Sequence, residues 1–237
     1  MKKRGFILFT LSKALREPLT FYVECIDGEK TRCYNGNISY ATLVAKGDYD
    51  MPPKPIISKQ DIINAAIQLV RDDGMDSVNA RSLASALTCS TKPLFRIYKN
   101  MEELKGDIIA ELDAYYNSFM DCRMTETNRL LSQGIAYIEF ARTERMIFNT
   151  LFMNRKLAGS SLRDIVHADW NRKSIENAQA ITGLSLDKAE MLFINIWLYS
   201  HGIATQIVTN GIDISLDTVT ELLTNAFEQF SIDISKK

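Results

Sequence analysis

The chain has 237 residues, of which 46% are hydrophobic and 24% are charged, and its formal net charge at pH 7 is -1. This composition is typical of a soluble globular protein that can bury a sizeable core. The near-zero net charge excludes a protein coated in positive charge, although it is compatible with a local basic patch.

Cysteine usage and hydropathy indicate the compartment and the absence of cofactors. No CxxC pair and no histidine at metal-ligand spacing accompanies Cys25, Cys33, Cys89 or Cys122. We therefore expect reduced thiols in a cytoplasmic protein that binds no metal and no cofactor. No apolar run approaches the roughly 20 residues that span a bilayer, so no membrane partner is expected.

Residues 1–50 form a poorly defined extension by their pattern. Short β-like apolar runs alternate with turn signals such as Asp27-Gly28, and no motif there carries chemistry. Our hypothesis is that translation starts at Met51 and that residues 1–50 are an appended segment or a misassigned start. The intact mass of the native protein would test this hypothesis.

The first predicted helix begins at Ser58. Ser58 and Asp61 have the spacing of a capping box, and apolar residues then recur at helical spacing as far as Val70. The helix is predicted to end near Asp72, before Gly74.

Two short helices joined by a tight turn are predicted next. Asn79 is the predicted cap of the first, whose apolar face carries Leu83, Ala84 and Leu87. The pattern then breaks over residues 88–90.

The second short helix is predicted to start near Thr91, with Ser90 as its cap and Pro93 in its first turn. Leu94 and either Ile97 or Tyr98 are expected to face inward. The outward face carries Thr91, Lys92, Phe95, Arg96 and Lys99, and residues 90–99 contain three basic residues and no acid. This arrangement is typical of a helix-turn-helix, in which a first helix braces a second that meets base edges and phosphates. The alternative is two helices of an ordinary bundle with a solvated charged face.

The segment from Ser58 to Ile109 resembles the DNA-binding domain of the TetR family of bacterial transcriptional regulators. The resemblance rests on the order of Ala65, Ala66 and Gly74, then Leu83, Ala84 and Ala86, then Ser90, then Leu94, Phe95 and Tyr98, then Glu102, Glu103 and Leu104. The chain departs from the family where Thr88 and Cys89 replace a Gly-Val turn and Met101 replaces a frequent lysine.

The resemblance implies an all-α fold with an N-terminal helix-turn-helix domain of three helices over residues 51–100. A larger C-terminal helical domain for effector binding and dimerisation would follow over residues 101–237. The residues implied to bind double-stranded DNA are Ser58, Lys59, Arg81, Ser90, Thr91, Lys92, Pro93, Phe95, Arg96 and Lys99.

Helical periodicity continues to the C-terminus. A helix is predicted from Met101 toward Met120, and further segments are helical by pattern over residues 130–141, 144–153, 161–181, 185–210 and 215–230. Ser185 is a predicted cap, and Gly211 separates the last two helices.

The last two helices carry more apolar surface than one subunit interior can cover. Residues 191–199 are apolar almost all round, and residues 215–230 carry a six-position apolar stripe that includes Phe227. We therefore predict a homodimer through a four-helix bundle, with close approach at Gly202 and Ala204. Such a dimer predicts a near-palindromic operator.

Aromatic side chains of the C-terminal region are predicted to line a pocket for an unidentified small-molecule effector, as the family resemblance implies. Core packing is the alternative for each of them. The tentative pocket residues are Tyr116, Phe119, Phe140, Phe148, Phe152, Trp170, Trp197 and His201.

No catalytic constellation is visible. His167 and His201 are the only histidines, and no GxSxG, HExxH, Walker or dinucleotide glycine pattern occurs. The expected function, as the family resemblance implies, is transcriptional regulation by a repressor that a small-molecule effector releases. The alternative is a helical adaptor that has the fold but does not bind an operator.

Overall fold

The structure is a computed structural model that describes residues 57–153 and 161–236. These residues contain helices and no strand, so the all-α prediction is confirmed; the predictions for residues 1–50 lie outside the described residues. The elements are α1 (Lys59–Asp73), η1 (Met75–Ser77), α2 (Ala80–Ala86), α3 (Leu94–Ile97), α4 (Met101–Asp121), α5 (Arg129–Thr143), α6 (Arg145–Phe148), η2 (Asn149–Met153), α7 (Leu162–Val166), α8 (Asp169–Thr182), α9 (Leu186–Asn210) and α10 (Leu216–Lys236).

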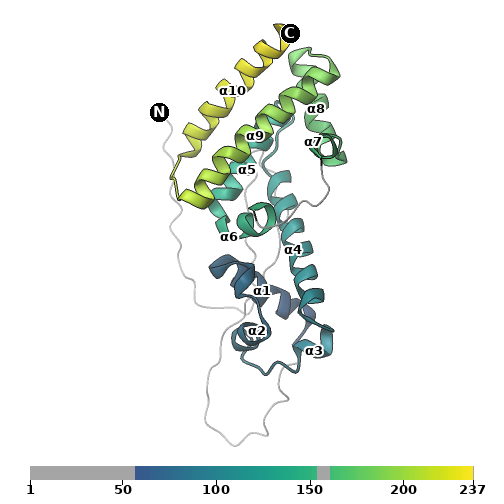
Figure 1. The fold of residues 1–237 in the computed structure, drawn as a ribbon, viewed down its shortest axis with the longest axis vertical. Helices are drawn as coiled ribbons and strands as arrows, with labels where there is room; N and C mark the ends of the chain where they lie inside the picture. The colour runs from purple at the N-terminus through teal and green to yellow at the C-terminus, as the bar shows by residue number, and fades with distance from the viewer. Residues whose placement is uncertain (1–56, 154–160, 237) are drawn as a thin grey trace, which may run out of the picture.

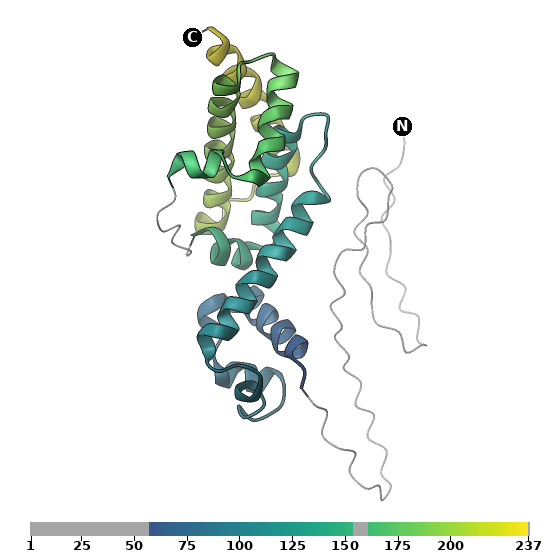
Figure 2. The same cartoon turned by 90° about the vertical axis from the view of Figure 1, so that its right-hand side faces the viewer.

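The molecule is elongated, with a small group of helices at one end and a larger bundle at the other (Figure 1). We call residues 57–100, with α1, α2 and α3, the head, and residues 129–236, with α5 to α10, the body. Figure 2 shows α4 running from the head into the body. The apolar side of α4 serves both parts, because its first half packs on α1 and a later part packs on α5.

The helix starts and stops in the head follow local signals. The Ser58 hydroxyl accepts a hydrogen bond from the Asp61 N–H, and the Asp61 carboxylate accepts one from the Ser58 N–H, which confirms the predicted capping box. Gly74 ends α1 with a φ of 80°, a conformation that favours glycine. The Asn79 side chain accepts from two backbone N–H groups, those of Arg81 and Ser82, as its predicted capping role requires.

The start of the second short helix was predicted wrongly. α3 begins at Leu94 instead of near Thr91, and Ser90 makes no capping hydrogen bond to it. Two causes lie in the preceding turn: Thr88 adopts a positive φ of 52°, and Pro93 has no N–H to donate. The first backbone bond back to Thr91, from Phe95, is accordingly long at 3.5 Å.

The body is built around α5 and α9. α9 packs against α5, α8 and α10, and α10 and α8 also pack against α5. Gly134 lets α5 and α9 approach closely, because a Cβ there would lie 2.7 Å from the Ser200 hydroxyl oxygen. By length and hydropathy α9 could cross a membrane. The sequence analysis did not expect an apolar segment long enough to span a bilayer. In the body α9 packs against α5, α8 and α10, and the side chains on its remaining face are exposed.

Three further helix predictions need correction. The single segment predicted over residues 161–181 is two helices, because Ala168 is extended and becomes the N-cap of α8. The Asn171 side chain, which donates to the Ile165 carbonyl at 2.8 Å, satisfies the end of α7 at this break. Ser185 precedes α9 as predicted, yet its side chain makes no capping hydrogen bond. α10 runs six residues beyond the predicted end at Phe230.

Candidate functional site

The outward face of α3 is the first candidate surface. Leu94 and Tyr98 are buried and hold α3 on the head, which decides between Ile97 and Tyr98 as the inward residue. Phe95 between them is 49% exposed. A large apolar side chain in that position is free to contact a ligand, because the fold does not need it for the core.

The charge around α3 is of one sign. From Ser77 to Met101 the chain contains no acid, and its basic residues there are Arg81, Lys92, Arg96 and Lys99. All four are exposed, and none forms an ion pair within the described parts of the chain. Their charges are therefore available to an anionic partner such as a phosphate backbone.

The remaining predicted DNA contacts lie around this surface. Ser90 is exposed in the turn, Thr91 and Pro93 are half-buried, and Ser58 caps α1. Lys59 differs from the other basic residues, since its Nζ lies 2.6 Å from Asp107 Oδ2 of α4 and 5.5 Å above the Tyr98 ring. This hydrogen-bonded ion pair lowers the pKa of Asp107. Lys59 therefore ties α1 to α4, and its DNA contact stays a prediction.

A second candidate site is a cluster of rings where α4, α5, α6, η2 and α9 meet. Phe140 is fully buried, with the rings of Phe119 and Tyr116 at 5.0 and 5.1 Å. We call the following residues the aromatic cluster: Tyr115, Tyr116, Phe119, Tyr137, Phe140, Phe148, Phe152, Trp197 and His201. Seven of the eight predicted pocket residues belong to it.

Trp170 is the exception among the predicted pocket residues. It lies at the start of α8, is 77% exposed and does not reach the aromatic cluster. The reason is the helical register, because the buried side of α8 is occupied by Asn171, Ser174 and Ile175. Trp170 is therefore removed from the candidate pocket.

Tyr115 and Tyr137 are the two cluster members that were not among the predicted pocket residues, and Tyr137 makes a polar contact within the cluster. Its hydroxyl lies 2.9 Å from His201 Nδ1, and its ring contacts Phe148 and Phe152 at 5.1 and 5.3 Å. The signal was present, since Tyr137 stands three residues before Phe140 on one helix face. The Tyr137 and His201 pair places hydrogen-bonding atoms inside a mainly aromatic cluster, and ligand sites combine apolar walls with a few polar groups in this way.

His201 is expected to make the stability of the protein depend on pH. Burial lowers the pKa of His201 from its ordinary value near 6.5. The unfolded chain therefore takes up this proton first as the pH falls, so the free energy of unfolding should decrease between about pH 7 and pH 5.

We expect the His201→Gln variant to lose this part of the decrease, because glutamine can bond Tyr137 but does not titrate. Urea unfolding at several pH values in this window measures the effect. The parent protein, unfolded at the same pH values, is the reference. An unchanged pH slope in His201→Gln would contradict the assignment.

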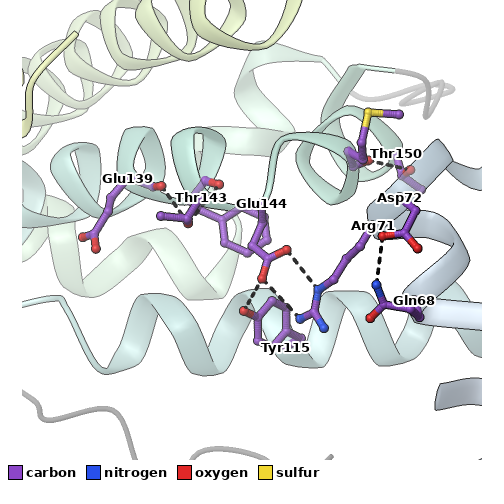
Figure 3. A network of polar contacts seen from close by, with 10 residues as sticks. Gln68, Arg71, Asp72, Tyr115, Glu139, Thr143, Glu144 and Thr150 are labelled. Carbon is purple, nitrogen blue, oxygen red and sulfur yellow. Dashed lines mark hydrogen bonds and ion pairs between the residues drawn. The ribbon is translucent and has the colours of Figure 1, made fainter. Parts of the chain in front are cut away.

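A third feature joins the head to the body (Figure 3). Arg71, in the last turn of α1, forms a two-pronged ion pair with Glu144, with Nε to Oε2 at 3.1 Å and Nη2 to Oε1 at 3.2 Å. The Tyr115 hydroxyl of α4 donates to Glu144 Oε1 at 2.7 Å. Burial, and then this hydrogen bond, raise the pKa of Tyr115 to about 12. Tyr115 also lies 6.0 Å from Phe140, so it belongs both to this network and to the aromatic cluster.

Comparisons with known proteins find matches among solved structures. No protein-family model matches the chain, and no curated protein matches its sequence. Among solved structures, the chain is similar to a TetR variant from Acinetobacter baumannii AYE in complex with minocycline. The TM-score is 0.46 at 18% sequence identity, and the match covers 76% of this chain and 97% of the other.

Proposed function

We propose that this protein is a TetR-type DNA-binding transcriptional regulator, a cytoplasmic homodimeric repressor that a small-molecule effector releases. The observation that carries the proposal is the outward face of α3. There a one-turn helix, anchored by Leu94 and Tyr98, presents Phe95 and unpaired basic side chains over a stretch without acids. Residues 51–100 would be the DNA-binding domain, and residues 101–237 would bind the effector and dimerise.

On this proposal the residues around α3 divide into two roles. Thr91, Phe95 and Arg96 would face base edges in the major groove, because Thr91 lies in the turn before the recognition helix and the other two lie on its outer side. Arg81, Lys92, Lys99 and the capped start of α1 at Ser58 would approach phosphates, which position the protein without reading sequence.

Replacing Arg96 with alanine tests the DNA-binding part. We expect a loss of about 1 to 3 kcal/mol in operator binding if Arg96 reads a base, and a smaller, sequence-independent loss if it touches only phosphate. An operator selected from random duplexes, compared with a scrambled duplex at fixed salt, separates these two cases. The control is Arg172→Ala, an exposed arginine on α8. Unchanged operator affinity in Arg96→Ala would contradict the placement of the recognition helix.

The same selection tests the alternative of an adaptor protein. A regulator should enrich a near-palindromic sequence, because a two-fold dimer presents two equal recognition helices. Failure of the parent protein to bind any selected duplex would exclude the regulator.

The dimer interface is proposed on α9 and α10, which run side by side along one side of the body (Figure 1). Met191, Leu198 and Gly202 share one face of α9, and the first two are 49% and 51% exposed. A Cβ at Gly202 would meet nothing within 4 Å, so this position is open to a partner helix. Leu222 on α10 is 36% exposed.

Phe227 was predicted to lie in this interface, but its side chain is buried within its own subunit. It is only 7% exposed and packs in a hydrophobic core of the body with Phe193 and Leu130. Most of the apolar stripe of α10 is buried within its own subunit, because α10 packs against both α5 and α9.

The effector site is proposed at the aromatic cluster, with the Tyr137 and His201 pair as its polar anchor. A ligand there would contact α4, which also carries the head. This supports release of DNA by ligand binding, since a displacement of α4 would move α3 with it.

A further inference from the structure

We propose that Arg71, Tyr115 and Glu144 form a latch that positions the head on the body and thereby sets the separation of the two recognition helices in a dimer. The inference rests on the proposed function, because only a dimer that reads two half-sites has such a separation. It assigns these residues a positioning role, and none of them is proposed to touch DNA.

The location of Glu144 suits a fixed anchor. Glu144 ends α5 and begins α6, so two helices of the body determine where its carboxylate lies. Its partner Arg71 lies in the last turn of α1, directly before the Gly74 turn that leads to α2. A movement of the head against the body would therefore have to break or stretch this ion pair.

The chemistry of the contact makes it stiffer than an ordinary surface ion pair. Exposed ion pairs contribute little, because solvent screens them and side-chain entropy opposes them. Here the Glu144 side chain is only 16% exposed, and both of its oxygens accept from the guanidinium. The Tyr115 hydroxyl adds a third bond, and its ring lies 5.2 Å from the Arg71 guanidinium carbon. A bidentate ion pair of this kind fixes the orientation of the guanidinium relative to the carboxylate as well as their distance.

The latch adds to two other connections between head and body, which are the helix α4 and the packing of α1 on α6. α4 alone joins them covalently, and a single helix leaves the head free to swing about its axis. α1 also packs against α6, where Met146 Cε lies 3.0 Å from the position of a Cβ on Gly74. The latch lies at the same contact between head and body, where its hydrogen bonds connect α1, α4 and the start of α6 (Figure 3).

The test measures spacing selectivity. The readout is the ratio of the affinities for the selected operator and for the same operator with one base pair inserted at its centre. Insertion changes the distance and the rotation between half-sites, so a rigid dimer should discriminate strongly. We expect Glu144→Gln, which keeps the shape but removes the charge, to lower this ratio at least about fivefold, the lower end of typical couplings. Tyr115→Phe should lower it less, because it removes one hydrogen bond.

This ratio of affinities distinguishes a change in the position of the head from a change in protein stability or in charge. A merely destabilised protein, or one in which Arg71 has only lost its counter-ion, would change its affinity for both duplexes alike. The control is Asp213→Asn, which removes the carboxylate 3.7 Å from Arg142 within the body and should leave the ratio unchanged.

Each outcome decides between the proposals. If the parent and both variants bind the operator with the same ratio, the latch is overturned while the regulator stands. If the parent binds no duplex at all, the regulator and the latch both fall. If Glu144→Gln does not fold, a lowered ratio in Tyr115→Phe still supports the latch and an unchanged one overturns it.

Discussion

Replacing Leu198 with glutamate is expected to convert the protein from a dimer into a folded monomer. Leu198 is 51% exposed in the subunit, so the change leaves the core of the body intact. In the proposed four-helix bundle the new carboxylate would be buried without a partner, and its copy would lie nearby across the two-fold axis. An uncompensated buried charge costs about 3 to 5 kcal/mol, which is at least about a hundredfold in the dimer dissociation constant.

Sedimentation over a range of concentrations measures this dissociation constant, and circular dichroism measures the helix content. Operator affinity should fall with dimerisation, because a monomer presents only one recognition helix. Ile181→Glu is the matched control, since Ile181 is 46% exposed and lies on α8, which carries none of the proposed interface residues. A parent that is monomeric at micromolar concentration, or a Leu198→Glu protein that dimerises as tightly, would contradict the interface.

Replacing Phe227 with alanine is expected to destabilise each subunit by about 3 to 5 kcal/mol, the usual cost of truncating a buried phenylalanine. Phe227 is 7% exposed in the core between α5, α9 and α10, and the surrounding helices can close the resulting cavity only in part. Leu222→Ala, on the same helix at 36% exposure, should cost much less.

Dimerisation also stabilises the folded state, so the experiment needs a monomeric background. Urea unfolding of Phe227→Ala combined with Leu198→Glu supplies it. If the loss persists there, Phe227 acts within the subunit. If the loss disappears and only the dimer is weakened, Phe227 lies in the interface after all.

The sequence by itself determined the elements whose signals are local. The Ser58 and Asp61 capping box, the Asn79 cap and the glycines that end α1 and α9 all act within a few residues. The resemblance of residues 58–109 to the TetR family rests on the same kind of signal. Local signals failed where two of them competed, as at Ser90, where the turn and Pro93 delayed the start of α3.

Tertiary structure alone decided which apolar and charged residues meet. Helical periodicity identifies a face but not its neighbour, so Phe227 and Leu198 were assigned to one interface although the first is buried within the subunit and the second is exposed. Trp170 was predicted to line the pocket, but the register of α8 places it on the surface. Arg71 and Glu144 are 73 residues apart, and no pattern in one sequence pairs them. Such contacts depend on how the helices pack, because packing angles and distances set which side chains come within reach.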